Sequence, residues 1–177
     1  DVINSGYVYG DYAGIVSYSG NTVTNSGTIE AAYIGVLLKD DSTLINSGDI
    51  NSATGGVVAA EDSIVIENTG NITGGADGVV LMGDDNQLSN AGFIQGNTDT
   101  GWGVYVTGVE NQITNSGTID GFYGIGLYSS GNTVTNSGTI SGEYIGIAAE
   151  TGNGNSLVNT GIVSSLNDGI RVCGSNQ

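Results

Sequence analysis

Apolar and polar residues alternate in short runs, and the whole pattern returns about every 22 residues. Its most regular part is an asparagine, a small residue, a glycine, any residue, and then Ile or Val. An aliphatic residue lies two positions before each asparagine, and a Gly-aliphatic pair follows about eleven positions after it. Period-two alternation broken by Gly, Asn, Ser and Asp is typical of short strands joined by turns, so each unit predicts three strands.

The motif occurs eight times, at spacings of 21 to 25 residues. Its asparagines are Asn4, Asn25, Asn46, Asn68, Asn90, Asn115, Asn136 and Asn159. Three short strands cannot bury a core alone, but they can form one triangular coil that stacks on the next coil. We therefore predict an all-β fold, a single-stranded parallel β-helix (β-solenoid) of about eight coils of ~22 residues, forming one domain over residues 1–177. The repeat is too short for a β-propeller blade and lacks a leucine-rich consensus.

Strand alternation places each motif asparagine on the same inner face as the aliphatic residue two positions before it. A buried amide needs hydrogen-bond partners, and identical amides stacked from coil to coil supply them to one another. The eight asparagines are therefore predicted to form a structural ladder with no catalytic role.

The charge balance is strongly acidic, with 18 Asp and Glu against Lys39 and Arg171, for a formal net charge of −16. Binding to nucleic acid or to an anionic membrane surface needs clustered Lys or Arg, so we expect neither partner. No apolar run approaches the ~20 residues that span a bilayer, and membrane insertion is not expected.

Acidic residues gather at one predicted turn of successive coils. They are Asp40, Asp41, Glu61, Asp62, Asp84 and Asp85, with Glu110 in the next coil. The favoured interpretation is a solvated acidic ridge. A weak Ca²⁺ site is the alternative, since Ca²⁺ binds several carboxylate oxygens. No calcium-loop signature is present, and no other cofactor is expected.

An aromatic residue precedes the third predicted strand in five coils: Tyr12, Tyr33, Trp102, Tyr123 and Tyr144. Stacked rings stabilise neighbouring coils, which is the favoured interpretation. Exposed rings would also suit contact with a glycan or a cell-surface protein. Two longer spacings predict loops at residues 97–101 and 151–155, where repeat proteins often bind partners.

Catalysis is not expected. The chain has no His, so no Ser/His/Asp or Cys/His arrangement can form. Two minor alternatives remain, a polysaccharide-degrading β-helix enzyme that uses carboxylates alone and an ice-binding protein. Thr-x-Thr pairs occur at Thr22/Thr24 and Thr133/Thr135, but the row is broken in the other coils.

The unit from Gly131 to Ile147 resembles the repeats of bacterial autotransporter passenger domains and related large adhesins. This resemblance implies secretion to the bacterial cell surface and a role in adhesion, aggregation or biofilm formation. A single cysteine, Cys173, fits an extracellular chain without disulfides. We expect the chain to be a segment of a longer repetitive surface protein.

The last four residues, 174–177, resemble the lead-in at residues 84–87 that begins a coil. Bare solenoid ends expose unpaired strands that template another chain. An alternative function is therefore a self-assembling extracellular fibre, in which copies or successive segments stack end to end.

Overall fold

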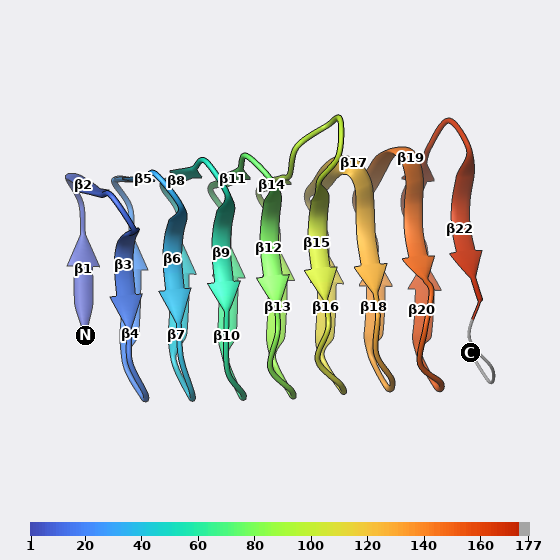
Figure 1. Cartoon of the computed structure of the whole chain (residues 1–177), viewed down its shortest axis with the longest axis horizontal. Coiled ribbons are helices and arrows are strands. Elements are labelled where there is room, and N and C mark those ends of the chain that lie inside the picture. Colours follow the sequence, from blue (N-terminus) through green and yellow to red (C-terminus); the bar gives the residue numbers. More distant parts are fainter. Residues whose placement is uncertain (174–177) are drawn as a thin grey trace.

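The computed structural model describes residues 1–173 as a straight solenoid of parallel strands, with the predicted all-β architecture and coil length. The N-terminal coil lies at one end of the rod and the last described coil at the other (Figure 1). Residues 1–173 contain no helix that is long and apolar enough to cross a membrane. The predicted resemblance of residues 174–177 to a coil lead-in lies outside the described residues.

The first face of the rod is a sheet of eight parallel strands, each ending at a motif asparagine. In order they are β1 (Val2–Asn4), β4 (Thr22–Asn25), β7 (Thr43–Asn46), β10 (Val65–Asn68), β13 (Gln87–Asn90), β16 (Gln112–Asn115), β18 (Thr133–Asn136) and β20 (Ser156–Asn159). The ladder is in register throughout, so every motif asparagine lies beside the asparagine of the next coil.

The second and third faces belong to one sheet, because two long strands run around the corner between them. The second face holds β2 (Tyr7–Gly10), β5 (Thr28–Ala31), β8 (Asp49–Ser52), β11 (Asn71–Gly74), β14 (Phe93–Gln95) and β21 (Ile162–Ser164). The third face holds β3 (Ala13–Ser17), β6 (Ile34–Leu38), β9 (Gly55–Ala59), β12 (Asp77–Leu81), β15 (Trp102–Val106) and β22 (Asp168–Val172). The strands that belong to both faces are β17 (Thr118–Leu127) and β19 (Thr139–Ala149).

The core is a set of aliphatic columns that run the length of the rod. Each face contributes the inward half of its alternation, and these side chains are almost wholly buried. The second face, for example, supplies the column Ile29, Ile50, Ile72, Ile94, Ile119 and Ile140. Because each coil covers only its neighbours, burial falls at the two ends, and Ile170 in β22 is 45% exposed.

Loop 97–101, predicted from the 25-residue spacing, protrudes between β14 and β15 (Figure 1). The amide N–H groups of Asp99 and Thr100 donate to the side-chain oxygen of Asn97, which closes the loop on itself. Loop 151–155 likewise separates β19 from β20. Both insertions leave the strand register of the neighbouring coils intact, because they add residues only at turns.

Candidate functional site

The motif asparagines form a continuous amide ladder. Each Nδ2 donates to the Oδ1 of the asparagine in the next coil, at 2.8 Å in all seven steps. From Asn25 onward, each Nδ2 also donates to the carbonyl of the glycine two residues later, as Asn68 does to Gly70 at 3.1 Å. Every inner amide is thus buried and satisfied, which assigns this column a structural role.

A second asparagine column lies four residues before the first and was not predicted. The Oδ1 atoms of Asn86, Asn111, Asn132 and Asn155 each accept a backbone N–H from the preceding coil, at 2.7–2.9 Å. Asparagine recurs there in five of seven coils, and Ser42 and Ile64 fill the other two. This recurrence of asparagine four residues before the motif asparagine could have predicted the second column from the sequence. These buried residues stabilise the turn between the third and first faces.

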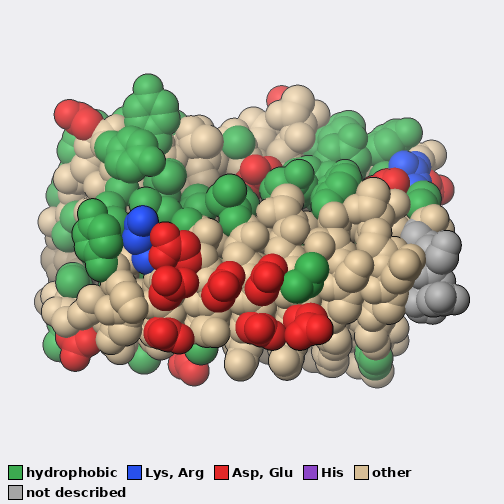
Figure 2. Space-filling model, turned by 60° about the horizontal axis from the view of Figure 1, so that its bottom comes forward, with side chains coloured by type: hydrophobic (Ala, Val, Ile, Leu, Met, Phe, Trp, Pro, Cys, Tyr) green, Lys and Arg blue, Asp and Glu red, His purple; other side chains and the backbone are tan. Residues whose placement is uncertain are grey.

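The acidic residues lie on that same turn, as predicted, in a row across the middle of the rod (Figure 2). Three of their carboxylates bind the backbone of the next coil. The Oδ1 atoms of Asp40, Asp62 and Asp84 accept the amide N–H groups of Asp62, Asp84 and Val109 at 2.8–3.1 Å. The row therefore contributes to coil stacking.

The calcium alternative gains no support from this arrangement. Within residues 1–173, no three acidic, His or Cys side chains gather around a common point. Glu61 instead pairs with Lys39 at 3.2 Å, and this cation lowers the pKa of the Glu61 carboxyl. Calcium binding at Asp40, Asp41, Glu61, Asp62, Asp84 and Asp85 stays a prediction.

The aromatic residues that sequence analysis placed in one row occupy two adjacent columns. Tyr12 lies beside Tyr33, with ring centroids 6.3 Å apart. Trp102 aligns one residue later, with Asp77 of β12, whose Oδ1 accepts the Trp102 N–H at 2.9 Å. Tyr144 sits at a bulge of β19, so Tyr123 pairs in register with Ile145 instead. The loop at residues 97–101 adds residues before Trp102, and the corner before Tyr123 has one residue fewer than in the next coil, so both rings move by one column. The motif spacing did not reveal these shifts.

The C-terminal half of the third face carries an aromatic cluster larger than predicted. Trp102 stacks on Tyr123 with ring centroids 4.2 Å apart. Around this pair lie three rings that sequence analysis did not select, Tyr105, Phe122 and Tyr128. The Trp102 ring covers Gly126, where a Cβ would collide with it. Burial raises the pKa of Tyr128.

One end of this cluster is charged. Phe122 stacks on Tyr144, with ring planes 4° apart, and the Arg171 guanidinium lies 5.8 Å from the Tyr144 centroid. Arg171 also pairs with Asp168 at 2.6 Å and with Glu150 at 3.5 Å. Since the rings in the middle are half-buried, Tyr144 is the member of the cluster most open to a partner, at 41% exposure.

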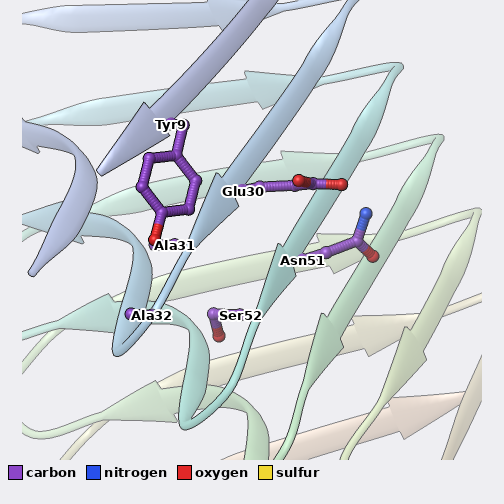
Figure 3. Close-up of a pocket in the computed structure, with 6 residues that line it drawn as sticks. All are labelled: Tyr9, Glu30, Ala31, Ala32, Asn51 and Ser52. Carbon is purple, nitrogen blue, oxygen red and sulfur yellow. The ribbon is translucent and has the colours of Figure 1, made fainter. Parts of the chain in front are cut away.

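A shallow hollow of about 240 Å³ lies at the corner after the second face (Figure 3). The Tyr9 ring extends over Ala31 on one side, and Ser52 lies at the far end. Glu30 and Asn51 extend side by side from β5 and β8. Glu30 accepts the hydroxyl of Tyr7 at 2.6 Å, and this bond raises the pKa of Tyr7. A second hollow occupies the same corner at the other end, lined by Ser141, Gly142, Glu143, Ser164, Ser165 and Leu166.

Comparison of the chain with models of protein families, with curated proteins and with solved structures found no match.

Proposed function

We propose that this chain is an extracellular structural and adhesive β-solenoid of a bacterial surface protein, which presents exposed aromatic side chains along a stiff rod. The observation that carries the proposal is the exposure of Tyr12, Tyr33 and Tyr144 at the corner between the second and third faces, at 63%, 58% and 41%. Exposed aromatic side chains supply large contact areas and a hydroxyl for hydrogen bonding. Glycans and cell-surface proteins are the partners that such rings suit.

The stiffness of the rod supports the same function. Continuous parallel ladders and a buried amide column join each coil to its neighbours, so a contact surface keeps its geometry over the whole length. A preorganised surface loses less conformational entropy when it binds. The repulsion that comes with a net charge of −16 disfavours binding to nucleic acid and to anionic membranes.

Adhesion can be tested with beads coated with the purified chain, presented to a glycan panel and to bacterial and host cells. The variant Tyr12→Ser/Tyr33→Ser/Tyr144→Ser removes the exposed rings of this corner. We expect it to lose at least about tenfold in binding, since each exposed ring contributes on the order of 1 kcal/mol. The matched control, Tyr7→Ser/Tyr9→Ser, removes equally exposed rings from the second face and keeps the binding. Equal binding by all three proteins contradicts the proposal.

A second candidate function is an end-to-end fibre, favoured by the direction of the amide ladder. Every inner Nδ2 points towards the C-terminal coils. Within residues 1–173, Asn159 Nδ2 donates to Gly161 O, and Asn4 Oδ1 accepts the N–H of Gly6. If a second copy stacked head to tail on the first, Asn159 Nδ2 of the first copy would donate to Asn4 Oδ1 of the second copy. Electron microscopy of the native material tests this, because filaments as wide as one rod are expected and uniform short particles contradict it.

A further inference from the structure

Tyrosine side chains of neighbouring coils lie side by side at several places on the rod. All nine tyrosines fall within residues 1–173, and six of them belong to such pairs. The pairs are Tyr12–Tyr33, Tyr105–Tyr128 and Tyr123–Tyr144, with ring centroids 6.3, 5.3 and 5.9 Å apart. Two neighbouring phenols are a reactive arrangement, because loss of one electron and one proton from each allows a carbon–carbon bond to form between the rings.

The Tyr12–Tyr33 pair is open to solvent and is held in place by its backbone. The two residues are 63% and 58% exposed, so a dissolved oxidant reaches both. The Ile34 N–H donates to the Tyr12 carbonyl at 3.0 Å, and the Gly55 N–H donates to the Tyr33 carbonyl at 3.0 Å. These bonds keep the two residues side by side, while exposed side chains turn on a picosecond-to-nanosecond timescale. The two rings, whose planes differ by 37°, can therefore meet without any change of the fold.

The other two pairs are fixed by packing. Tyr123 is stacked on Trp102 with ring centroids 4.2 Å apart, and its ring plane stands at 89° to that of Tyr144. Tyr105 and Tyr128 are half-buried beside the same Trp102 ring. These rings have less freedom to turn towards each other and are less accessible to an oxidant.

The remaining tyrosines are exposed but unpaired. Within residues 1–173, Tyr7, Tyr9 and Tyr18 have no tyrosine ring packed against theirs. Tyr18 is 66% exposed, and its ring lies 5.7 Å from the Lys39 amino group. Because Tyr18 matches the exposure of Tyr12 and lacks a partner ring, it separates the effect of exposure from the effect of pairing.

We propose that Tyr12 and Tyr33 form an oxidative cross-linking site, at which a haem peroxidase and hydrogen peroxide join the two rings as dityrosine. The oxidant takes one electron and one proton from each phenol and leaves two tyrosyl radicals. A bond forms between a Cε atom of each ring, and the hydrogen on each of these carbons moves to a phenol oxygen, which restores both aromatic rings. The two electrons and two protons reduce one molecule of hydrogen peroxide to two molecules of water.

Coupling within one chain is favoured over coupling between chains. Side chains that the fold holds next to each other have an effective concentration in the millimolar range, on the order of a thousandfold above a chain concentration of about 1 μM. The formal net charge of −16 also keeps separate chains apart. The new bond closes the chain from residue 12 to residue 33, which removes conformational entropy from the unfolded state and stabilises the folded rod.

Treatment of the purified chain at about 1 μM with haem peroxidase and hydrogen peroxide tests the site. The blue fluorescence of dityrosine reports coupling, and gel electrophoresis under reducing conditions, which remove any disulfide through Cys173, separates monomers from dimers. Cleavage after Glu30 separates Tyr12 from Tyr33, which is the one tyrosine between Glu30 and Glu61. A species that joins fragments 1–30 and 31–61 in mass spectrometry therefore identifies Tyr33 as one partner of the bond.

We expect the unmodified chain and Tyr18→Phe to give monomeric dityrosine that joins these two fragments, with a higher thermal midpoint after coupling. Tyr12→Phe and Tyr33→Phe keep the ring and lose the hydroxyl that forms the radical, and we expect at least about tenfold less of this product from each. Circular dichroism checks that every variant keeps its β-structure.

The cross-linking site is overturned if the unmodified chain forms no dityrosine, if dimers are the main product, or if the bond joins other tyrosines. Equal yields from Tyr12→Phe and Tyr18→Phe overturn it as well. Bead adhesion is a separate property, because Tyr12→Phe/Tyr33→Phe blocks coupling but keeps both rings for contact with a partner. Cross-linking and adhesion can therefore fail independently of each other.

Discussion

At the scale of single residues, the rod depends on buried polar atoms that are satisfied only by the same atoms of neighbouring coils. Asn68 illustrates this, since its amide bonds Asn46 on one side and Asn90 on the other. A hydrophobic residue would fill the space but leave both neighbours with unmet hydrogen bonds. Ladder positions therefore contribute more to stability than their small size suggests.

We predict that Asn68→Ala lowers the free energy of unfolding by about 2–3 kcal/mol, because two buried amides lose a partner. Asn159→Ala, at an exposed position of the last described coil, is expected to cost less than about 1 kcal/mol. Urea denaturation followed by circular dichroism measures both. If the two variants lost similar amounts of unfolding free energy, the contribution of a ladder asparagine would not depend on its burial.

Asp77 carries the clearest pH dependence in the described residues. Burial raises the pKa of its carboxyl, although the bond from the Trp102 N–H opposes the shift. The folded state therefore holds this proton more tightly than the unfolded state. Its contribution to stability is complete below the ordinary pKa and is lost as the pH rises through the folded pKa.

Replacing Asp77 by Asn keeps an oxygen that can accept the Trp102 N–H and removes the charge. We predict that Asp77→Asn is more stable than the unmodified chain at pH 7 and equal to it near pH 3, where both side chains are neutral. Thermal melting across this pH range measures the difference. A variant that is less stable at pH 7 would contradict the sign.

At the scale of secondary-structure elements, the turns decide how closely the coils stack. The motif glycines form a column, and a Cβ at Gly70 would collide with the carbonyl oxygen of Gly48 in the preceding coil. The first glycine of the column, Gly6, has open space where a Cβ would lie. These positions have no positive φ, so a left-handed backbone is not the reason for glycine here. Glycine is required because the coils approach too closely to leave room for a Cβ.

We predict that Gly70→Ala costs at least about 3 kcal/mol, because the turn must shift away from its neighbour and weaken the strand ladders on both sides. Gly6→Ala is its matched control at the same motif position, and we expect a change within about 0.5 kcal/mol. Denaturant titration of the two variants tests the difference. Equal effects would mean that the stacking distance is not set at this turn.

The turn between the third and first faces has a different requirement. Its residue one position before the second asparagine column adopts a left-handed conformation in every described coil that has this turn. Glycine fills the place at Gly20, Gly131 and Gly154, whereas Asp41, Ser63, Asp85 and Glu110 adopt φ of 55–57°. A side chain other than Gly costs roughly 1–2 kcal/mol in this region.

We predict that Glu110→Gly raises the free energy of unfolding by about 1 kcal/mol, and that Gly131→Ala lowers it by a similar amount. The two positions are equivalent in successive coils, so each controls for the other. Changes in thermal midpoint of opposite sign are expected. If both variants change stability in the same direction, backbone strain does not dominate this turn.

At the scale of the whole molecule, charge and shape are distributed unequally around the rod. Acidic side chains form a row along the axis of the rod, and hydrophobic side chains gather above that row (Figure 2). Most acidic side chains are exposed, and two cations offset them. The folded rod therefore concentrates repulsion that the unfolded chain would spread out.

We predict that raising the salt concentration from about 10 mM to 500 mM increases the thermal midpoint, because screening shortens the range of this repulsion from about 30 Å to a few Å. Differential scanning calorimetry of the dilute purified chain measures this shift. A midpoint that falls with salt would mean that ion pairs such as Lys39–Glu61 outweigh the repulsion.

Much of this architecture follows from the sequence alone, because a solenoid repeats one local interaction. A side chain that recurs every ~22 residues meets its own copy, so period and alternation predicted the fold, the inward aliphatic columns and the positions of Asn4 to Asn159 in one ladder. The acidic turn followed from the same reasoning, since successive Asp and Glu residues shared one place in the unit.

Only the tertiary structure decided features that depend on exact register at the corners. A turn that is longer or shorter than its neighbours moves the following side chains to another column, which separated Trp102 from Tyr33 and brought Phe122 against Tyr144. Likewise, the apolar run at residues 55–59 does not show from sequence which side chains point into the core and which point outward. The folded coil decides this. The repeat predicts which residues stack along the axis of the rod. The path of the chain around each coil depends on turns of varying length, so the sequence pattern alone does not fix it.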